Sequence, residues 1–271
     1  MKIIYKLLFL FLLTIGYSSC DFLDIVPDEI TTEADAFKDR NAAKNFVYSC
    51  YGYLPQSNVA SGSLDLLTGD EVITAFEHET FASFPKGNYT ASSPVISYWN
   101  TFFQGLRQCY IFLENVDKVP DLTESVKTDY IAQVKFLIAY YHYQLARCYG
   151  PIILIKELPD VNASQAEYLP RTSYDECVDW ICNLLDEAAS SLPAIRTNKE
   201  DYGLATSVGA KAVKAKMLLY AASPLFNGNS SFYSNFTDKS GSQLMPLTYD
   251  PNTWGKAKTA FIEAIVLAEQ N

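Results

Sequence analysis

Residues 124–151 read ESVKTDYIAQVKFLIAYYHYQLARCYGP and contain the strongest helical pattern in the chain. Apolar side chains recur here at spacings of three and four residues, which places them on one broad face of a helix. The Gly150-Pro151 pair ends the pattern, because glycine accommodates the backbone turn that closes a helix and proline cannot continue one. The stretch therefore predicts a long helix, from about residue 124 to residue 149, with a wide buried face.

The same spacing of apolar residues recurs before and after this stretch. Ser173 and Glu176 fit a capping box at the start of one such helix. Asp250-Pro251 fit an N-cap followed by a proline in the first turn of another. The further helices that we expect span residues 33–53, 95–116, 173–191, 207–222 and 253–269.

The four helices from residue 124 onward form two predicted antiparallel pairs, 124–149 with 173–191 and 207–222 with 253–269. The starts near residues 173 and 207 are about 34 residues apart, which is the period of tetratricopeptide repeats. The loops within each pair are longer than the turn of that repeat. We therefore predict a mainly α fold, in which tetratricopeptide-like helical hairpins form a right-handed superhelical stack with long irregular loops.

The last predicted helix runs to Gln270-Asn271 without a stop signal and without a following partner helix. A helix of this kind either caps the stack or belongs to a truncated chain. We expect truncation.

The first residues have the composition of an export signal. Lys2 and Lys6 precede a short apolar run over residues 7–15, and small residues lead from there to Cys20. This is the pattern of a secretory signal peptide, and the run is too short for a helix that spans a bilayer. We predict that residues 1–19 are removed and that Cys20 carries a lipid; ordinary secretion, with Cys20 as a plain thiol, is the alternative.

Charge and composition exclude some classes of partner. Without residues 1–19 the formal net charge falls from −10 to −12, because two lysines are lost. An acidic chain is repelled by phosphate backbones, so we predict no nucleic-acid partner. The chain has 19 Tyr and 16 Phe. Tyrosine suits wet interfaces and sugar rings, although we expect most of these rings to pack between helices.

Cysteine and histidine give little support for a metal site. Apart from Cys20 the chain has an odd number of cysteines at irregular spacing, which fits neither a disulfide framework nor a zinc motif. We expect them to be small buried groups on helices. His78 and His142 are the two histidines, and His142 lies in the apolar pattern, where core packing explains it. No cofactor or metal is predicted.

Two groups of acidic residues are the candidates for catalysis. Asp70-Glu71 and the pair Glu77 and Glu79 are carboxylate clusters of the kind that glycosidases use. That mechanism requires a defined separation between two carboxyl groups, which a sequence does not give, and acidic pairs on a loop are mostly solvated. Neither histidine has the context of a nucleophile elbow. We predict that the protein is not an enzyme.

Five blocks, in order along the chain, resemble the SusD/RagB family of outer-membrane lipoproteins of Bacteroidetes. They are CDFLDIVP at 20–27, YWNTFFQGL at 98–106, the helix and strand-like segment at 134–154, LPRTSY at 169–174 and AASPLFNG at 221–228.

The resemblance implies a protein of the cell outer membrane, anchored by a lipid (palmitate) on Cys20 and facing outward. Such a protein captures glycans and delivers them to a SusC-like TonB-dependent transporter, without chemistry of its own. Family members are about twice as long. The resemblance therefore implies that residues 20–271 are an N-terminal helical domain, truncated relative to full-length members.

Glycan binding needs aromatic faces together with carboxylates, amides and hydroxyls. Two long loops, over residues 55–97 and 226–249, are punctuated by Gly and Pro, and loops of this length are often functional. Trp99 also fits the helical period, so a core position is the alternative for it. The candidate ligand-binding residues are Asp70, Glu71, Asn88, Tyr89, Tyr98, Trp99, Asn227 and Tyr233.

Two alternative functions stay open. One is a helical-repeat scaffold for a protein or peptide ligand, and the other is a carbohydrate-active enzyme.

Overall fold

The computed structural model describes residues 33–55, 80–160, 162 and 169–271. One compact unit, Phe37–Asn271, contains the long helices; in the other, Met1–Ala36, the described part is the short helix α2 (Glu33–Ala36). The predicted signal peptide and Cys20 lie outside the described residues. The helices of the larger unit are α3 (Arg40–Tyr51), α4 (Trp99–Asn115), α5 (Glu124–Tyr149), α6 (Tyr174–Ser191), α7 (Ser207–Ala222), α8 (Ser230–Tyr233) and α9 (Asn252–Glu269).

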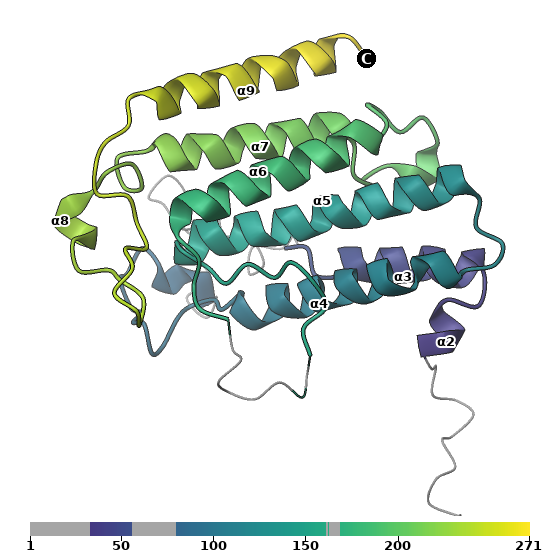
Figure 1. Ribbon diagram of the computed structural model, residues 1–271, viewed down its shortest axis with the longest axis horizontal. Coiled ribbons are helices and arrows are strands. Elements are labelled where there is room, and N and C mark those ends of the chain that lie inside the picture. The colour runs from purple at the N-terminus through teal and green to yellow at the C-terminus, as the bar shows by residue number, and fades with distance from the viewer. Residues whose placement is uncertain (1–32, 56–79, 161, 163–168) are drawn as a thin grey trace, which may run out of the picture. The chain divides into compact units, whose positions relative to one another are not determined.

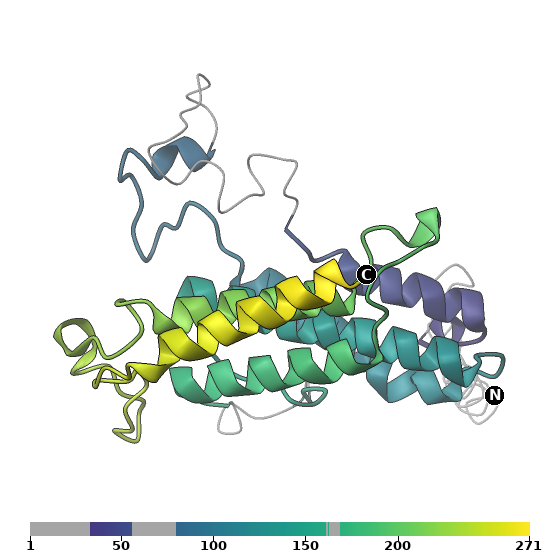
Figure 2. The same ribbon diagram turned by 90° about the horizontal axis from the view of Figure 1, so that it is seen from above.

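Apart from the short α8, these helices stack in chain order, and neighbours run antiparallel (Figure 1). Helices α3 and α4 pack on each other and on α5, after which α6, α7 and α9 follow one another. Seen from above, α9 lies over α7 (Figure 2). Both predicted pairs, α5 with α6 and α7 with α9, are present. The predicted fold class, mainly α with tetratricopeptide-like hairpins, is confirmed.

The connections contain little regular structure. Within the described ranges no residue belongs to a β-strand, and two isolated bridges, Thr90–Ser93 and Thr237–Gln243, close turns. Short 3-10 turns occur at Thr80–Ser83, Val116–Lys118 and Lys199–Asp201. None of the helices in the described residues is both long and apolar enough to cross a bilayer.

Helix α5 is the centre of the stack and is buried on several sides. Tyr141 packs toward α4, with its ring centroid 5.7 Å from that of Phe102, and its hydroxyl donates to the Cys50 carbonyl at 2.5 Å. Tyr143 points toward α7, where its ring lies 6.3 Å from that of Tyr220. A helix with apolar side chains on most of its circumference is stable only when neighbours surround it. The neighbours of α5 on several sides therefore account for its wide apolar face.

The predicted single helix over residues 33–53 is wrong near its start. Helix α2 ends at Ala36 and α3 begins at Arg40. The carboxylate of Asp39 accepts a hydrogen bond from the Ala42 amide at 2.8 Å and so caps a new helix. Short acidic side chains favour such caps over helix interiors, because they compete with the backbone for its own hydrogen bonds.

Four of the five described cysteines are buried on helices, as predicted: Cys50, Cys109, Cys177 and Cys182. Burial raises the pKa of the Cys182 thiol to about 12 and that of Cys177 to about 11. These thiols therefore stay protonated and pack as small apolar groups. Cys148 is exposed.

Candidate functional site

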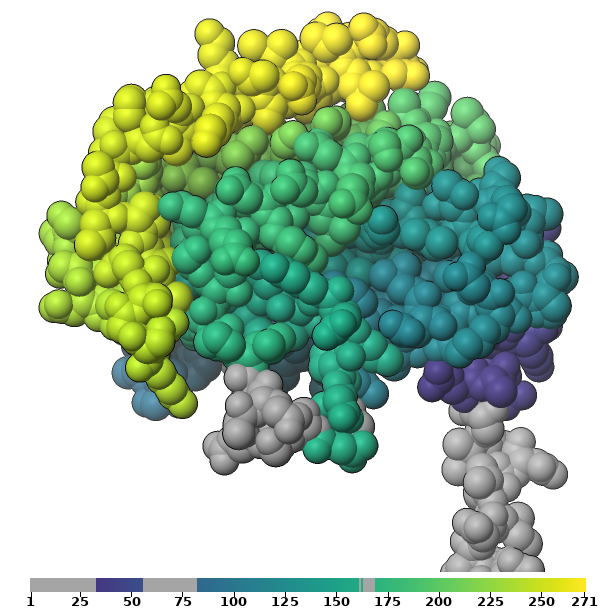
Figure 3. All heavy atoms as spheres, viewed as in Figure 1, coloured from purple at the N-terminus to yellow at the C-terminus, as the bar shows by residue number. Residues whose placement is uncertain are grey.

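One end of the stack carries the two described segments that supply predicted site residues, 80–98 and 223–251. The Tyr98 amide donates to the Tyr149 hydroxyl at 2.9 Å, which ties the first segment to the end of α5. The Tyr174 amide donates to the Leu244 carbonyl at 2.8 Å, which ties the second to the start of α6. The ends of antiparallel helices thus bring the two segments to the same end (Figure 1). In the space-filling view the second segment forms a projecting rim beside α6 (Figure 3).

Trp99 is the centre of an aromatic cluster at the start of α4. Its ring lies 5.2 Å from that of Tyr149, edge to face, and 4.9 Å from that of Phe103. The Arg171 guanidinium lies over the Trp99 ring at 5.2 Å from its centroid, and it donates to the Pro151 carbonyl at 2.5 Å. A cation over an indole face is attracted by its quadrupole. Trp99 is half-buried, so it anchors this end and leaves part of the ring to solvent.

Tyr98 and Tyr89 differ in how much ring they offer. Tyr98 is half-buried and stacked on Phe102, with centroids 5.2 Å apart. Tyr89 is 50% exposed and touches Phe84, at 5.4 Å between centroids. The amide of neighbouring Asn88 donates to the Ser83 carbonyl at 3.0 Å, which fixes the turn while the Asn88 side chain stays exposed. Tyr89 with Asn88 is therefore a ring face beside an amide, the combination that suits a sugar.

Asn227 is a structural residue in this arrangement. It is buried, and its side-chain nitrogen donates to the Asp250 carbonyl at 2.9 Å and to the Thr253 hydroxyl at 2.8 Å. Its side-chain oxygen accepts from the Asp250 amide at 2.9 Å. These bonds hold the 223–251 segment to the start of α9 and leave little of the amide for a ligand.

Tyr233 is half-buried, and its ring lies 6.3 Å from that of Phe232. Phe232 is 73% exposed and Tyr249 is 56% exposed. The most exposed rings of this segment are thus those of Phe232 and Tyr249 rather than that of the predicted Tyr233.

The remaining acidic candidates, Asp70 and Glu71, lie outside the described residues, as do Glu77 and Glu79. Among the residues that the structure describes, no cluster of three or more His, Cys, Asp or Glu side chains could hold a metal ion. The sequence reasoning missed Tyr149 and Arg171. The available signal was the antiparallel pairing, which places the end of α5 and the start of α6 beside the start of α4.

The comparisons with known proteins agree with this fold. The model of a family described as starch-binding and associating with the outer membrane matches residues 21–219. The SusD-like protein P25 of Formosa agariphila is 23% identical over 230 residues, 80% of this chain and 43% of that protein. The solved structure of BT4246 superposes with a TM-score of 0.75 at 34% identity, over 86% of this chain and 40% of that one. A SusD-like protein of Bacteroides fragilis gives a TM-score of 0.59 at 26% identity, over 72% and 37%.

The fold and these likenesses define a helical protein of the tetratricopeptide-like class found in outer-membrane glycan-binding proteins. The chain belongs to the SusD-like family. It spans about two fifths of the length of the relatives it matches.

Proposed function

We propose that residues 20–271 are the N-terminal glycan-capturing part of a cell-surface lipoprotein. The protein holds oligosaccharides or polysaccharides and delivers them, chemically unchanged, to a SusC-like TonB-dependent transporter. The observation that carries the proposal is the family match over residues 21–219, together with 34% identity to BT4246 over 86% of the chain. The exposed rings and amides at one end of the stack supply the chemistry.

Binding at this end rests on ring faces that the fold holds in place. The Tyr89 ring is half exposed on a turn fixed by backbone hydrogen bonds and lies 5.4 Å from the Phe84 ring, so little backbone freedom is lost when a pyranose ring covers it. The cluster around Trp99 holds the neighbouring backbone rigid. A protein that binds both glycan and transporter raises the local concentration of glycan at the transporter, and needs no catalytic groups to do so.

The lipid on Cys20 and the outward-facing position in the outer membrane are part of the same proposal. Growth with a radioactive fatty acid should label the protein, and Cys20→Ala should remove the label. Equal labelling of both proteins would contradict the anchor.

Titration calorimetry of the purified protein against a panel of neutral oligosaccharides tests capture. We expect binding in the micromolar to millimolar range, and about fivefold weaker binding after Tyr89→Ala, since stacking on an aromatic ring contributes about 1 kcal/mol. Tyr202→Ala is the matched control, because Tyr202 is also exposed, at 64%, but lies at the other end of the stack. No binding at millimolar glycan, or equal weakening by both changes, contradicts the proposal. Release of shortened products establishes an enzyme instead.

A protein or peptide ligand is favoured by one observation, the exposed side chains Ile262, Ile265 and Val266 on α9. These are purely aliphatic and offer a glycan no hydrogen bond. A ligand that binds through them would lose affinity after Ile262→Glu but not after Tyr89→Ala, which separates the two functions.

A further inference from the structure

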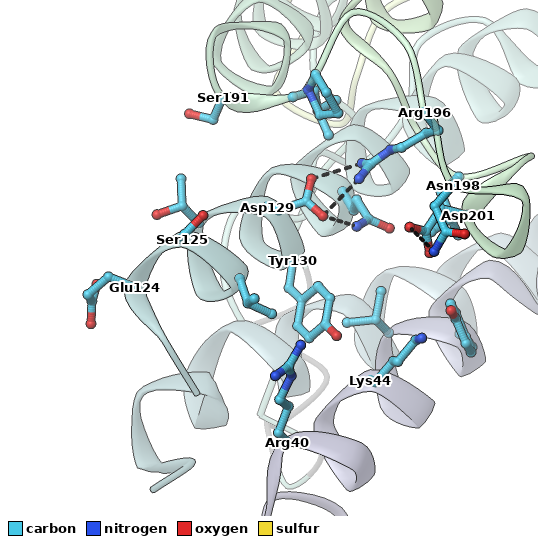
Figure 4. Close-up of a pocket in the computed structure, with 18 of the residues that line it drawn as sticks. Arg40, Lys44, Glu124, Ser125, Asp129, Tyr130, Ser191, Arg196, Asn198 and Asp201 are labelled. Atoms are coloured by element: carbon cyan, nitrogen blue, oxygen red, sulfur yellow. Dashed lines mark hydrogen bonds and ion pairs between the residues drawn. The ribbon is translucent and has the colours of Figure 1, made fainter. Parts of the chain in front are cut away.

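A pocket of about 830 Å³ lies at the other end of the stack, between the starts of α3 and α5, the end of α6 and the 192–204 segment (Figure 4). Its volume is in the range of small-molecule sites, roughly 300–1,000 Å³. Helix α5 has 26 residues and is therefore about 39 Å long. The pocket touches its first turns, whereas the candidate site above lies at its last. The pocket and the candidate glycan site are therefore separate.

The wall formed by α5 and the 192–204 segment is a satisfied hydrogen-bond network. Arg196 donates to both carboxylate oxygens of Asp129, at 2.9 Å each, and to the Ala205 carbonyl at 2.8 Å. Gln133 donates to Asp129 at 2.8 Å and accepts from the Tyr51 hydroxyl at 3.0 Å. A bidentate pair of this kind is rigid and its charges cancel. Arg196 and Asp129 therefore shape the pocket but are not free to bind a ligand.

Arg40 and Lys44 bring positive charge to the opposite wall. They lie one turn apart on α3, and both side chains face the pocket (Figure 4). Among the ion pairs of the described residues none involves the Arg40 guanidinium, and the Lys44 ammonium lies 5.5 Å from the centroid of the Tyr48 ring. The acidic residue Glu124 is paired with Lys127 at 2.7 Å.

Asp201 is the remaining carboxylate of the pocket lining and accepts a 3.4 Å hydrogen bond from Asn198. The lining therefore carries three cationic and three acidic side chains and is close to neutral as a whole. Arg40 and Lys44 are the two cations of this lining that no ion pair among the described residues engages. A guanidinium of this kind binds a carboxylate through two parallel hydrogen bonds.

The rest of the lining suits a hydroxylated ring. Tyr48 is 37% exposed, and the Lys44 ammonium lies over one face of its ring. Ser125, Thr128 and Ser191 add hydroxyl groups that can donate and accept. We propose that this pocket is a second binding site, which takes a hexuronate unit of an acidic oligosaccharide, with the sugar ring near Tyr48 and its carboxylate on Arg40.

The test compares two disaccharides that differ in the carboxylate. Purified protein is titrated with digalacturonate and with galactobiose of the same linkage. We expect digalacturonate to bind at least about tenfold more tightly, because a hydrogen bond to a charged group is worth about 1.5–3 kcal/mol, and to bind more weakly as salt is raised.

The variants Arg40→Gln and Lys44→Gln each remove one charge. Arg40→Gln keeps the backbone amide that donates to Asp121 at 2.6 Å, so α3 keeps its start. We expect about tenfold weaker digalacturonate binding after Arg40→Gln and a smaller loss after Lys44→Gln. Lys216→Gln, at an exposed position on α7 outside the pocket, should change nothing.

Three results overturn the proposal. Equal affinity for the two disaccharides shows that the carboxylate is not recognised. Competition by acetate at the same concentration as digalacturonate shows that a bare carboxylate suffices. Loss of digalacturonate binding after Tyr89→Ala, with normal binding after Arg40→Gln, places the ligand at the other end of the stack and leaves glycan capture there intact.

Discussion

His142 shows how a polar side chain is held inside the stack. It is fully buried, with Nδ1 2.8 Å from the Ile138 carbonyl oxygen, and Nε2 accepts from the Ile155 amide at 3.1 Å. The neutral ring with its hydrogen on Nδ1 satisfies both bonds. Burial lowers the pKa of His142 from 6.5 to about 4, and the bond to Ile138 opposes this only in part. The prediction from sequence that His142 packs in the core is confirmed.

The lowered pKa of His142 predicts a loss of stability in acid. The unfolded chain takes up a proton on this residue as the pH falls below 6.5, and the folded chain does so only near pH 4. The free energy of unfolding should therefore be highest above pH 6.5 and fall by about 3 kcal/mol by pH 4 from this residue alone. Titration of the imidazole signals by nuclear magnetic resonance measures the pKa of His142 in the folded chain. His78→Gln identifies the remaining signal, and a midpoint near 6.5 for His142 would contradict the prediction.

Gly228 is a second position where one residue decides local structure. Its φ is +77°, and a Cβ there would overlap the backbone nitrogen of Tyr249. Gly228→Ala should lower the free energy of unfolding by at least about 3 kcal/mol, since strain and overlap add. Gly241 has a φ of +87° but open space around it, so Gly241→Ala should cost only about 1–2 kcal/mol. Urea unfolding measures both, and equal losses would show that overlap does not matter.

At the scale of the element, α4 can approach its neighbours closely because of Gly105. A Cβ there would lie 3.0 Å from the Tyr141 ring and 3.0 Å from the Tyr53 Cβ. Tyr141 cannot move away, because its hydroxyl is bound to the Cys50 carbonyl. Gly105→Ala should therefore destabilise the protein by about 1–3 kcal/mol, although alanine is the better helix former.

Gly255 on α9 is the matched control, because a Cβ there meets nothing within 4 Å. Gly255→Ala should raise the free energy of unfolding by up to about 1 kcal/mol. Opposite signs for the two changes, measured by thermal unfolding, support the close packing of α4. The same sign for both would contradict it.

The sequence predicted most helices well, for a physical reason. The bounds of α5 and the Ser173 cap of α6, which accepts from the Glu176 amide at 3.4 Å, depend on local signals that a sequence contains. The break before α3 was missed, because a polar residue such as Asp39 is compatible with the exposed face of a continuous helix. Only the structure shows that its carboxylate caps Arg40–Tyr51.

The candidate site was predicted less completely. Tyr89 and Trp99 could be named as candidates because aromatic rings on a loop or at a helix start can be recognised one by one, and their part in binding stays a prediction. The contact of Arg171 with Trp99 arises only when distant helix ends meet. The pocket with Arg40 draws on three helices and a loop, and no local pattern joins these segments.

At the scale of the whole molecule, α9 uses its smallest side chains for packing. Ala257, Ala260 and Ala264 are buried, whereas Ile262 and Ile265 are about half exposed. Several larger apolar side chains of this helix, Ile262, Ile265 and Val266 among them, are therefore exposed in the chain as described. A cluster of this kind favours association.

We predict concentration-dependent self-association of the purified protein through this face of α9. Ile262→Glu should reduce it, since a charge is costly to bury between two chains. Ile195→Glu is the matched control, because Ile195 is likewise 50% exposed but lies outside α9. Sedimentation velocity over a range of concentrations measures the effect. Unchanged association after Ile262→Glu would assign the contact to another surface.

The central position of α5 has a consequence for amide hydrogen exchange. This helix contacts α3, α4, α6 and α7, whereas α9 packs mainly on α7. The amides of α5 can exchange with deuterated solvent only when most of the stack separates. Their exchange should therefore report the free energy of global unfolding. The amides of α9 should exchange through a local opening of lower free energy. A gradient of protection from the middle of the stack to its edge would thus record the order in which the layers come apart.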